Sequence, residues 1–440
     1  MRAVLISTYD LGRQPFGLAS PAAWLREAGV EVACADLAKE RLSEDLVRAA
    51  DVVAFFLPMH TATRLALPVI DRVRELAPSA RLVAYGLYAP LNASLLRERG
   101  IQHVLGGEFE EDLVRLARGK VPSAATPIPR LQFRAPDRAG LLPLARYATL
   151  QAGDVRRTAG YTEASRGCKH FCRHCPIVPV YEGRFRIVAP DIVMVDVRAQ
   201  VAAGARHITF GDPDFFNGIR HAAAVIERFG RECPDVSYDV TIKVEHLLKH
   251  ADMLPLLRDT GCAFVTSAVE SVDDDVLAKL AKGHTRADVE RVVDLCRQAR
   301  LVLAPTFVAF TPWTTIEGYC DLLQAIDRLA LVDHVASIQL AIRLLVPQGS
   351  RLLDLDDMRA LAERFDPVSL THRWSHPDPR VDELQGRVAN LVGARTSARR
   401  DDVFAEVWQL AHEAGGADAL RVPPPLVRAT VPYLDEPWYC

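Results

Sequence analysis

Three closely spaced cysteines could carry the chemistry of this chain. They are Cys168, Cys172 and Cys175, with the spacing C-x3-C-x2-C, in a loop that follows a strand-like segment. Cysteine thiolates hold iron–sulfur clusters, and a cluster of four irons normally takes four of them. With three thiolates, one iron keeps an open position, as catalytic metal sites do. The spacing therefore predicts a 4Fe–4S cluster with one iron free to bind a further ligand.

Two other interpretations of the cysteines fit the sequence less well. A zinc site built on a C-x2-C pair needs a second pair of ligands at matched spacing, and the nearest candidates, His170 and His174, lie inside the loop itself. A purely structural role as small buried side chains is disfavoured because Lys169 and Arg173 crowd the same loop.

The cysteine loop resembles the signature of the radical SAM superfamily, in which an aromatic residue precedes the last cysteine. His174 fills that position here. The resemblance implies that the amino and carboxylate groups of S-adenosylmethionine chelate the open iron, and that an electron from the cluster cleaves the sulfonium to give a carbon radical. It also implies an open six-stranded partial barrel, and parallel barrels place their chemistry at the carboxyl ends of the strands.

The alternation of strand and helix patterns from residue 156 to 350 fits such a barrel. The six expected strands are Tyr161–Ser165, His207–Gly211, Ser237–Lys243, Ala263–Val269, Leu301–Phe310 and His334–Arg343. Alternation of this kind predicts a parallel sheet with helices against it. The predicted fold class is α/β, with an N-terminal doubly wound sheet, a (βα)6 partial TIM barrel and a helical C-terminal extension.

Residues 1–120 form the predicted N-terminal domain, and the proline-rich residues 121–155 form a linker. The expected strands of the domain are Ala3–Ser7, Val30–Ala35, Asp51–Leu57, Arg81–Tyr85 and Gln102–Leu105. This domain resembles the cobalamin-binding-type, flavodoxin-like domain that precedes many radical SAM domains. The Asp-x-His-x-x-Gly element that supplies a histidine to cobalt is missing, so cobalamin binding and a role in docking or substrate binding both stay open.

The segment that ends the second expected barrel strand is a candidate site for S-adenosylmethionine. It contains Gly211, Asp212 and Asp214, in the place of the superfamily's Gly-Gly-Glu motif, which holds the amino group of the cofactor. An ammonium group beside a cluster needs a carboxylate partner, and either aspartate could supply it. The alternative is an ordinary Asp-Pro turn after a strand.

Further candidates end the third, fourth and sixth expected strands. Glu270 and Ser271 resemble the position that grips the ribose hydroxyls of the cofactor in this superfamily, and acids rarely lie in apolar strand runs without a partner or a site. Lys243 could pair with the methionine carboxylate or with Glu245. Arg343 could reach the cofactor or an anionic substrate, or lie at the surface.

The C-terminal segment, residues 351–440, suggests a lid and a tail that ends in cysteine. His376 lies among prolines after Trp374 and could contact substrate or act as a general acid–base, with ordinary packing of a lid as the alternative. The final Cys440 resembles the end of a radical SAM subgroup with Cys-Cys-Ala-Glu-Pro or Cys-selenocysteine-Ala-Glu-Pro tails. This resemblance suggests that a selenocysteine codon was read as a stop and that the native chain continues.

Together these features predict a radical SAM enzyme that starts radical chemistry on a small-molecule or peptide substrate, with cobalamin-dependent methyl transfer as one outcome. The rival reaction transfers an aminocarboxypropyl or adenosyl group to arsenic or selenium held by the Cys440 thiol. A non-catalytic iron–sulfur sensor is a further alternative, disfavoured by the acids at several strand ends. An electron donor such as flavodoxin or ferredoxin is the expected protein partner.

Composition argues against several other classes. The 440 residues carry a net charge of −3 with no block of like charges, which disfavours a nucleic-acid partner and transfer-RNA modification. No stretch is apolar over the length that crosses a bilayer, and the N-terminus does not resemble a signal peptide. Scattered cysteines argue against a disulfide framework. We therefore expect a cytoplasmic protein.

Overall fold

A five-stranded parallel sheet forms the N-terminal domain. The computed structural model of the protein describes residues 1–123, 128–416 and 431–435. The sheet has the order β2-β1-β3-β4-β5, and every pair of neighbours is parallel. Its strands are β1 (Arg2–Ser7), β2 (Glu31–Asp36), β3 (Val52–Phe56), β4 (Arg81–Tyr85) and β5 (His103–Leu105). The prediction of a doubly wound, flavodoxin-like sheet is confirmed.

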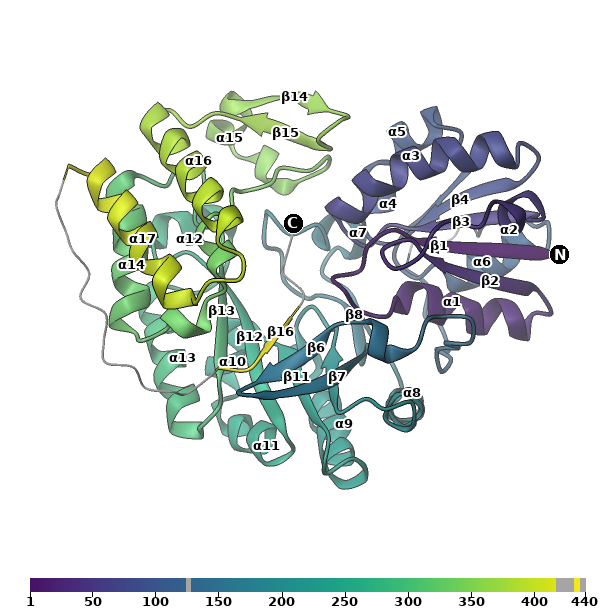
Figure 1. The fold of residues 1–440 in the computed structure, drawn as a ribbon, viewed down its shortest axis with the longest axis horizontal. Helices are drawn as coiled ribbons and strands as arrows, with labels where there is room; N and C mark the ends of the chain where they lie inside the picture. Colours follow the sequence, from purple (N-terminus) through teal and green to yellow (C-terminus); the bar gives the residue numbers. More distant parts are fainter. Residues whose placement is uncertain (124–127, 417–430, 436–440) are drawn as a thin grey trace.

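Helices cover both faces of this sheet (Figure 1). They are α1 (Phe16–Glu27), α2 (Glu44–Arg48), α3 (His60–Leu76), α4 (Tyr88–Leu91), α5 (Ala93–Glu98) and α6 (Glu110–Ala117). Successive side chains of a strand point to opposite faces. On the central strand β3, Val53 and Phe55 therefore enter one apolar core, while Val52 and Ala54 enter the other. Burial on both faces explains the continuous apolar runs of these strands.

The second sheet is the open barrel, with the strand order β13-β12-β11-β10-β7-β6-β16. Its parallel strands are β7 (Val155–Thr162), β10 (His207–Phe210), β11 (Ser237–Thr241), β12 (Cys262–Glu270) and β13 (Leu303–Phe307). The antiparallel strands β6 (Thr149–Ala152) and β16 (Tyr433–Leu434) extend one edge. The helices of this region are α8 (Pro190–Ala202), α9 (Ile219–Glu232), α10 (Val244–Lys249), α11 (Leu254–Asp259), α12 (Asp274–Leu280), α13 (Arg286–Ala299) and α14 (Ile316–Arg328).

The expected sixth barrel strand over residues 334–343 is wrong. That region contains two short 3-10 turns, Val332–His334 and Ser337–Leu340, and it joins the sheet through one parallel bridge between Phe310 and Arg343. The reason lies in two side chains. The Gln339 amide oxygen accepts a hydrogen bond from Phe307 N at 3.0 Å, and His334 Nδ1 donates to Leu303 O at 2.6 Å. These side chains form hydrogen bonds with backbone groups on the free edge of β13, where a sixth strand would otherwise pair.

The C-terminal extension is largely helical, as predicted, and it adds a hairpin. Its elements are α15 (Asp356–Leu361), the antiparallel pair β14 (Ala362–Asp366) and β15 (Thr371–Trp374), α16 (Pro379–Ala394) and α17 (Arg400–Ala414). Figure 1 shows α17 beside α14, and α16 packs against α17. Val388 on α16 and Phe404 on α17 belong to the same apolar core as the barrel strands. The extension is therefore packed onto the barrel.

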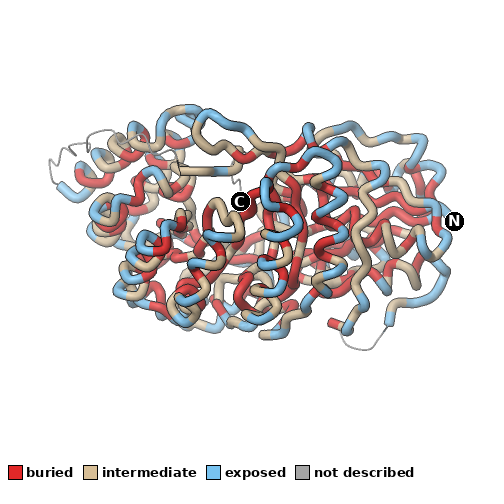
Figure 2. Tube along the Cα trace, turned by 90° about the horizontal axis from the view of Figure 1, so that it is seen from below, coloured by how far each residue is buried: buried red, intermediate tan, exposed pale blue. Residues whose placement is uncertain are grey.

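The two sheets meet through buried polar contacts. Arg138, in the segment between them, pairs with Asp196 on α8 at 2.9 Å and donates to Gln14 Oε1 in the first domain at 2.8 Å. Buried residues continue from one sheet region into the other in Figure 2. Among the described residues, no helix has both the length and the apolar character needed to cross a membrane.

Candidate active site

The cysteine loop is enclosed by a short antiparallel pair, β8 (Ser165–Gly167) and β9 (Phe185–Ile187), and ends in α7 (Val178–Tyr181). Gly167 starts the loop with φ of 76°, and a Cβ atom there would lie 2.5 Å from Arg184 O, so the turn requires glycine. Within the loop, Cys175 N donates to Cys172 O at 3.2 Å. Arg173 fastens the loop to α12 through its N–H bond to Leu280 O at 2.9 Å.

The three cysteine thiols lie close enough to interact electrostatically, and none forms a disulfide within the described part of the chain. Burial raises the pKa of the Cys175 thiol to about 12, and the sulfur atoms of Cys172 and Cys168 act in the same direction, whereas Lys282 opposes them. Burial also raises the pKa of Cys168. Thiols in such a group become thiolates together only when a cation shares them, as iron does in a cluster. This donor set fits an iron–sulfur cluster.

Asp212, two residues after β10, bonds to the segment that precedes the cysteine loop. Its carboxylate accepts hydrogen bonds from Ser165 Oγ at 2.5 Å and Ala164 N at 2.9 Å, and burial raises its pKa to about 7. Asp212 thus fixes the segment that leads into the cysteine loop. The adjacent Gly211 lies against the ring of Tyr161, whose Oη would be 1.7 Å from a Cβ atom at that position.

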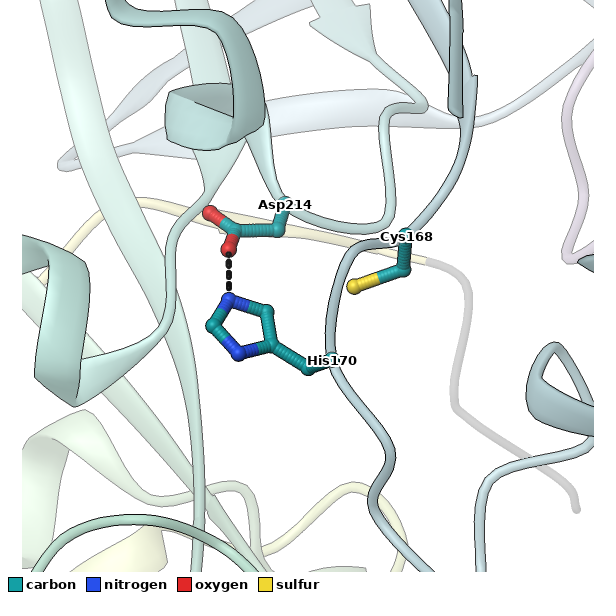
Figure 3. A group of neighbouring side chains, drawn as sticks. All are labelled: Cys168, His170 and Asp214. Carbon is teal, nitrogen blue, oxygen red and sulfur yellow. Dashed lines mark ion pairs between the residues drawn. The ribbon is translucent and has the colours of Figure 1, made fainter. Parts of the chain in front are cut away.

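Asp214, two residues later, faces the cysteine loop. Its Oδ2 atom lies 3.2 Å from Nε2 of His170, a residue of that loop, and 2.7 Å from Nδ1 of His246 on α10. Figure 3 shows the Asp214 carboxylate, the His170 ring and the Cys168 thiol around one space. Burial opposes ionisation of Asp214, but the two imidazoles lower its pKa to about 2. Asp214 is therefore the aspartate that the fold brings to the cysteines.

Lys243 and Glu245, which follow β11, pair with each other. Lys243 Nζ lies 3.5 Å from Glu245 Oε2, and the same oxygen lies 3.5 Å from Nδ1 of His170. The Lys243 side chain is 9% exposed, whereas that of Glu245 is 45% exposed. The pair thus connects the end of β11 with the cysteine loop.

Glu270 ends β12 and contacts His174, the residue before the last cysteine. Its Oε1 atom lies 3.2 Å from His174 Nε2 and 3.4 Å from Lys282 Nζ. Burial raises the pKa of Glu270, but the charge of Lys282 and the contact with His174 lower it to about 2. The φ of Glu270 is 70°, a conformation that residues other than glycine rarely adopt. Ser271 caps the following turn, since its Oγ accepts a bond from Asp273 N at 3.1 Å.

Arg343 and His376 form a second group, in the C-terminal extension. The Arg343 guanidinium lies 3.6 Å from the centre of the Trp374 ring and donates to Asp382 at 2.6 Å. His376 N donates to the other Asp382 oxygen at 3.0 Å, and its Nδ1 accepts from Asp378 N at 2.9 Å. These contacts fasten the start of α16 to the barrel. Cys440, the other predicted catalytic residue, lies outside the described residues.

A buried ion-pair group joins the first domain to the start of the cysteine loop. Arg166 lies 3.0 Å from Glu108, 2.7 Å from Glu110 and 2.7 Å from Glu163. Glu108 and Glu110 follow β5, at the carboxyl end of the N-terminal sheet. Tyr181, on α7, also donates to Glu108 at 3.3 Å. The carboxyl ends of both sheets therefore meet around Arg166.

Sequence patterns did not single out several residues of this site. His246 and Lys282 approach the cysteine loop from α10 and from the end of α12, and Arg166 joins it to the first domain. The one available signal is that His246 follows directly after Lys243 and Glu245, which end an expected strand. Their partners are far away in the sequence, so no local spacing marks them.

Comparisons with known proteins agree with this geometry. Residues 162–314 match the profile of the radical SAM superfamily. The tRNA-2-methylthio-N(6)-dimethylallyladenosine synthase of Desulfosudis oleivorans is 24% identical over 279 residues, 59% of this chain and 57% of that protein. The hopanoid C-3 methylase of Methylococcus capsulatus is 23% identical over 151 residues, 34% of this chain and 29% of that protein. The chain thus spans less than two thirds of these curated relatives.

Solved structures resemble the chain over a larger part of its length. TsrM from Kitasatospora setae, a radical S-adenosylmethionine methyltransferase, matches with a TM-score of 0.62 and 18% identity over 75% of this chain and 71% of that chain. OxsB, a cobalamin-dependent S-adenosylmethionine radical enzyme, matches with a TM-score of 0.71 and 12% identity over 90% of this chain and 67% of that chain. At these identities the likeness concerns the fold.

The fold, the cysteine loop and the family match together define the class of this domain. The open barrel, with three free cysteines in a loop at its strand ends, is a radical SAM domain. The superfamily uses a 4Fe–4S cluster and S-adenosylmethionine. Residues 162–314 thus form a radical SAM domain, and the N-terminal domain shares its fold with the matched part of OxsB.

Proposed function

We propose that the protein is a cobalamin-dependent radical SAM methyltransferase that acts on a small-molecule or peptide substrate. The observation that carries this proposal is the buried group around Arg166, which joins the carboxyl ends of the N-terminal strands to the cysteine loop. In sheets of this order, ligands bind beyond the carboxyl ends of the strands, at the switch point between β1 and β3. A corrinoid at that edge would share an interface with the cluster domain.

One histidine at this edge fits a corrinoid site. His60 begins α3, directly after β3, and is 6% exposed. Its Nε2 atom lies 2.6 Å from Ser369 O, and since a carbonyl only accepts, the proton is on Nε2. Nδ1 then carries a lone pair, and it is buried without a hydrogen-bond partner among the residues that the structure describes. The edge therefore offers a nitrogen donor even without the Asp-x-His-x-x-Gly element.

The names of similar proteins support methyl transfer. TsrM is a methyltransferase whose structure holds cobalamin and a [4Fe-4S] cluster, OxsB binds aqua-cobalamin, and the Methylococcus relative is a methylase. When bound, the cluster supplies the electron that cleaves S-adenosylmethionine, and cobalamin carries the methyl group. In this chain Cys168, Cys172 and Cys175 hold the cluster, and Glu270 with Lys282 binds polar groups of the cofactor beside it.

The products made from S-adenosylmethionine test the proposal. Full-length protein, reconstituted without oxygen and supplied with hydroxocobalamin and a reductant, is expected to retain one corrinoid and to release S-adenosylhomocysteine, the product left after methyl transfer. Release of 5′-methylthioadenosine would contradict it, because that product marks transfer of the aminocarboxypropyl group. Formation of 5′-deoxyadenosine alone would also contradict it, since the methyl group then stays on methionine.

Glu270→Gln should weaken binding of S-adenosylmethionine by about 10- to 100-fold, the effect of losing a buried, charge-assisted hydrogen bond. The reason is that the neutral amide cannot balance Lys282, which is 3% exposed. Equilibrium dialysis of the cofactor against cluster-loaded protein measures the change. Glu290→Gln, at a half-exposed position of α13, is the matched control and should bind as the wild type does. Equal affinity of the two variants would place the cofactor elsewhere.

A further inference from the structure

The side chain of Asn217 spans the first cysteine of the loop. Asn217 lies in the 3-10 turn Phe215–Gly218, which follows β10, and it is 1% exposed. Its Oδ1 atom accepts a hydrogen bond from Lys169 N at 3.2 Å, and its Nδ2 atom donates to Gly167 O at 3.5 Å. Gly167 and Lys169 are the chain neighbours of Cys168. The amide is therefore anchored on both sides of that cysteine.

These contacts fix the orientation of the Asn217 amide. A backbone N–H only donates and a carbonyl only accepts, so the oxygen faces Lys169 N and the nitrogen faces Gly167 O. The amide nitrogen carries two protons, and Gly167 O takes one of them. The second proton is available to the thiolate of Cys168, the residue between the two anchors.

The charge balance at Cys168 agrees with such a donor. Burial raises the pKa of the Cys168 thiol, and the charge of Asp214 acts in the same direction. The backbone N–H of His170 and the side chain of Asn217 lower that pKa. Both groups therefore stabilise the thiolate, which is the form that binds a metal. Of the two, Asn217 acts through its side chain, so a substitution can remove it.

A hydrogen-bond donor to a cluster thiolate also changes the energy of reduction. Hydrogen bonds to the sulfur atoms are among the factors that set the reduction potential of an iron–sulfur cluster. Reduction adds one negative charge, and an N–H group stabilises the more negative state more strongly. In this site the donor opposes the carboxylate of Asp214, which lies within 4.8 Å of Cys168 Sγ.

We propose that Asn217 is a positioning residue for the iron–sulfur cluster, whose amide N–H bonds to the Cys168 thiolate and raises the reduction potential. This inference rests on the proposed function, which assigns Cys168 to the cluster. The bonds to Lys169 and Gly167 direct the amide at the sulfur before a cluster is bound. Asn217 thus makes the cluster easier to reduce than it would be beside Asp214 alone.

A redox titration of the full-length, cluster-loaded protein tests the effect on the potential. Asn217→Leu keeps the size of the side chain but removes the donor, so we expect reduction to become about tenfold less favourable, about 59 mV for a one-electron couple. Electron paramagnetic resonance of the reduced cluster measures the change. Asn92→Leu is the matched control, because Asn92 is 4% exposed and donates to Tyr88 O, in the N-terminal domain. The control should keep the wild-type potential. An unchanged potential in Asn217→Leu protein that holds its iron would overturn the proposal.

Nitrogen-15 in the wild-type protein tests the bond without a substitution. The chain has three asparagines, Asn92, Asn217 and Asn390, and of these Asn217 contacts the cysteine loop. Protein labelled in the asparagine side-chain amides is reduced with dithionite and studied by pulsed electron paramagnetic resonance. We expect a nitrogen-15 coupling to the cluster spin. A reduced cluster without this coupling would overturn the proposal, and this result decides the outcome if Asn217→Leu does not fold or loses its iron. Failure of the proposed cluster would appear in the iron content of the wild-type protein instead.

Discussion

Cys172→Ala will fold but will not hold the iron–sulfur cluster. Cys172 is the most buried of the three loop cysteines, at 7% exposed. Its replacement removes one of three thiolates and creates a cavity of a single sulfur atom, which costs about 1 kcal/mol of folding free energy. Two thiolates do not retain four irons, so cluster content and cleavage of S-adenosylmethionine should each fall at least about 100-fold. Iron and sulfide analysis, with chromatography of the cofactor products, measures both losses.

Cys233→Ala is the matched control for this loss. Cys233 is similarly buried, at 6% exposed, but it ends α9, far along the chain from the cysteine loop. The control should keep its iron, its visible absorbance and its activity, while it loses a similar amount of folding free energy. A Cys172→Ala protein that still binds four irons would show that the cluster is held by other residues.

The N-terminal sheet was predictable because its strands are buried on both faces. The expected strand Arg81–Tyr85 coincides with β4, and each of the others differs from the observed strand by one residue at one or both ends. The hairpin of β14 and β15 was not predicted, since β14 is partly exposed and its Glu363 and Arg364 break the apolar pattern. Strands that cover a core on one face alone give a weaker pattern in the sequence.

The candidate site was predictable only where its residues are neighbours in the sequence. The cysteines share one loop, so their spacing carries the information. The sequence could not show which of Asp212 and Asp214 lies at the cysteine loop. The backbone after β10 turns the Asp212 carboxylate toward Ser165 and the Asp214 carboxylate toward His170. The meeting of Asp214 with His246 depends on the pairing of β10 with β11, which tertiary packing decides.

Arg166→Met should destabilise the protein by about 3–5 kcal/mol, as expected when a buried ion pair loses one partner. The Arg166 side chain is 8% exposed, and those of Glu108 and Glu110 are 0% exposed. Methionine fills similar space without charge, so the carboxylates are left buried without their cation. Urea unfolding monitored by circular dichroism gives the free energy. Arg184→Met is the control, since its pair with Glu182 is exposed and should contribute less than about 1 kcal/mol.

The pH dependence of the lost stability in Arg166→Met distinguishes the effect of the buried charge from the effect of lost packing. Burial already raises the pKa of Glu108 to about 7, although the charge of Arg166 lowers it. Without Arg166 that pKa rises further, so the folded variant binds more protons than the unfolded chain, and its stability falls as the pH rises. The loss of folding free energy in Arg166→Met should therefore be smaller at pH 5 than at pH 8. Adding Glu108→Gln to this variant should restore part of the lost free energy at pH 8. A deficit that is equal at both values would mean that lost packing, and not the buried charge, joins the two domains at this point.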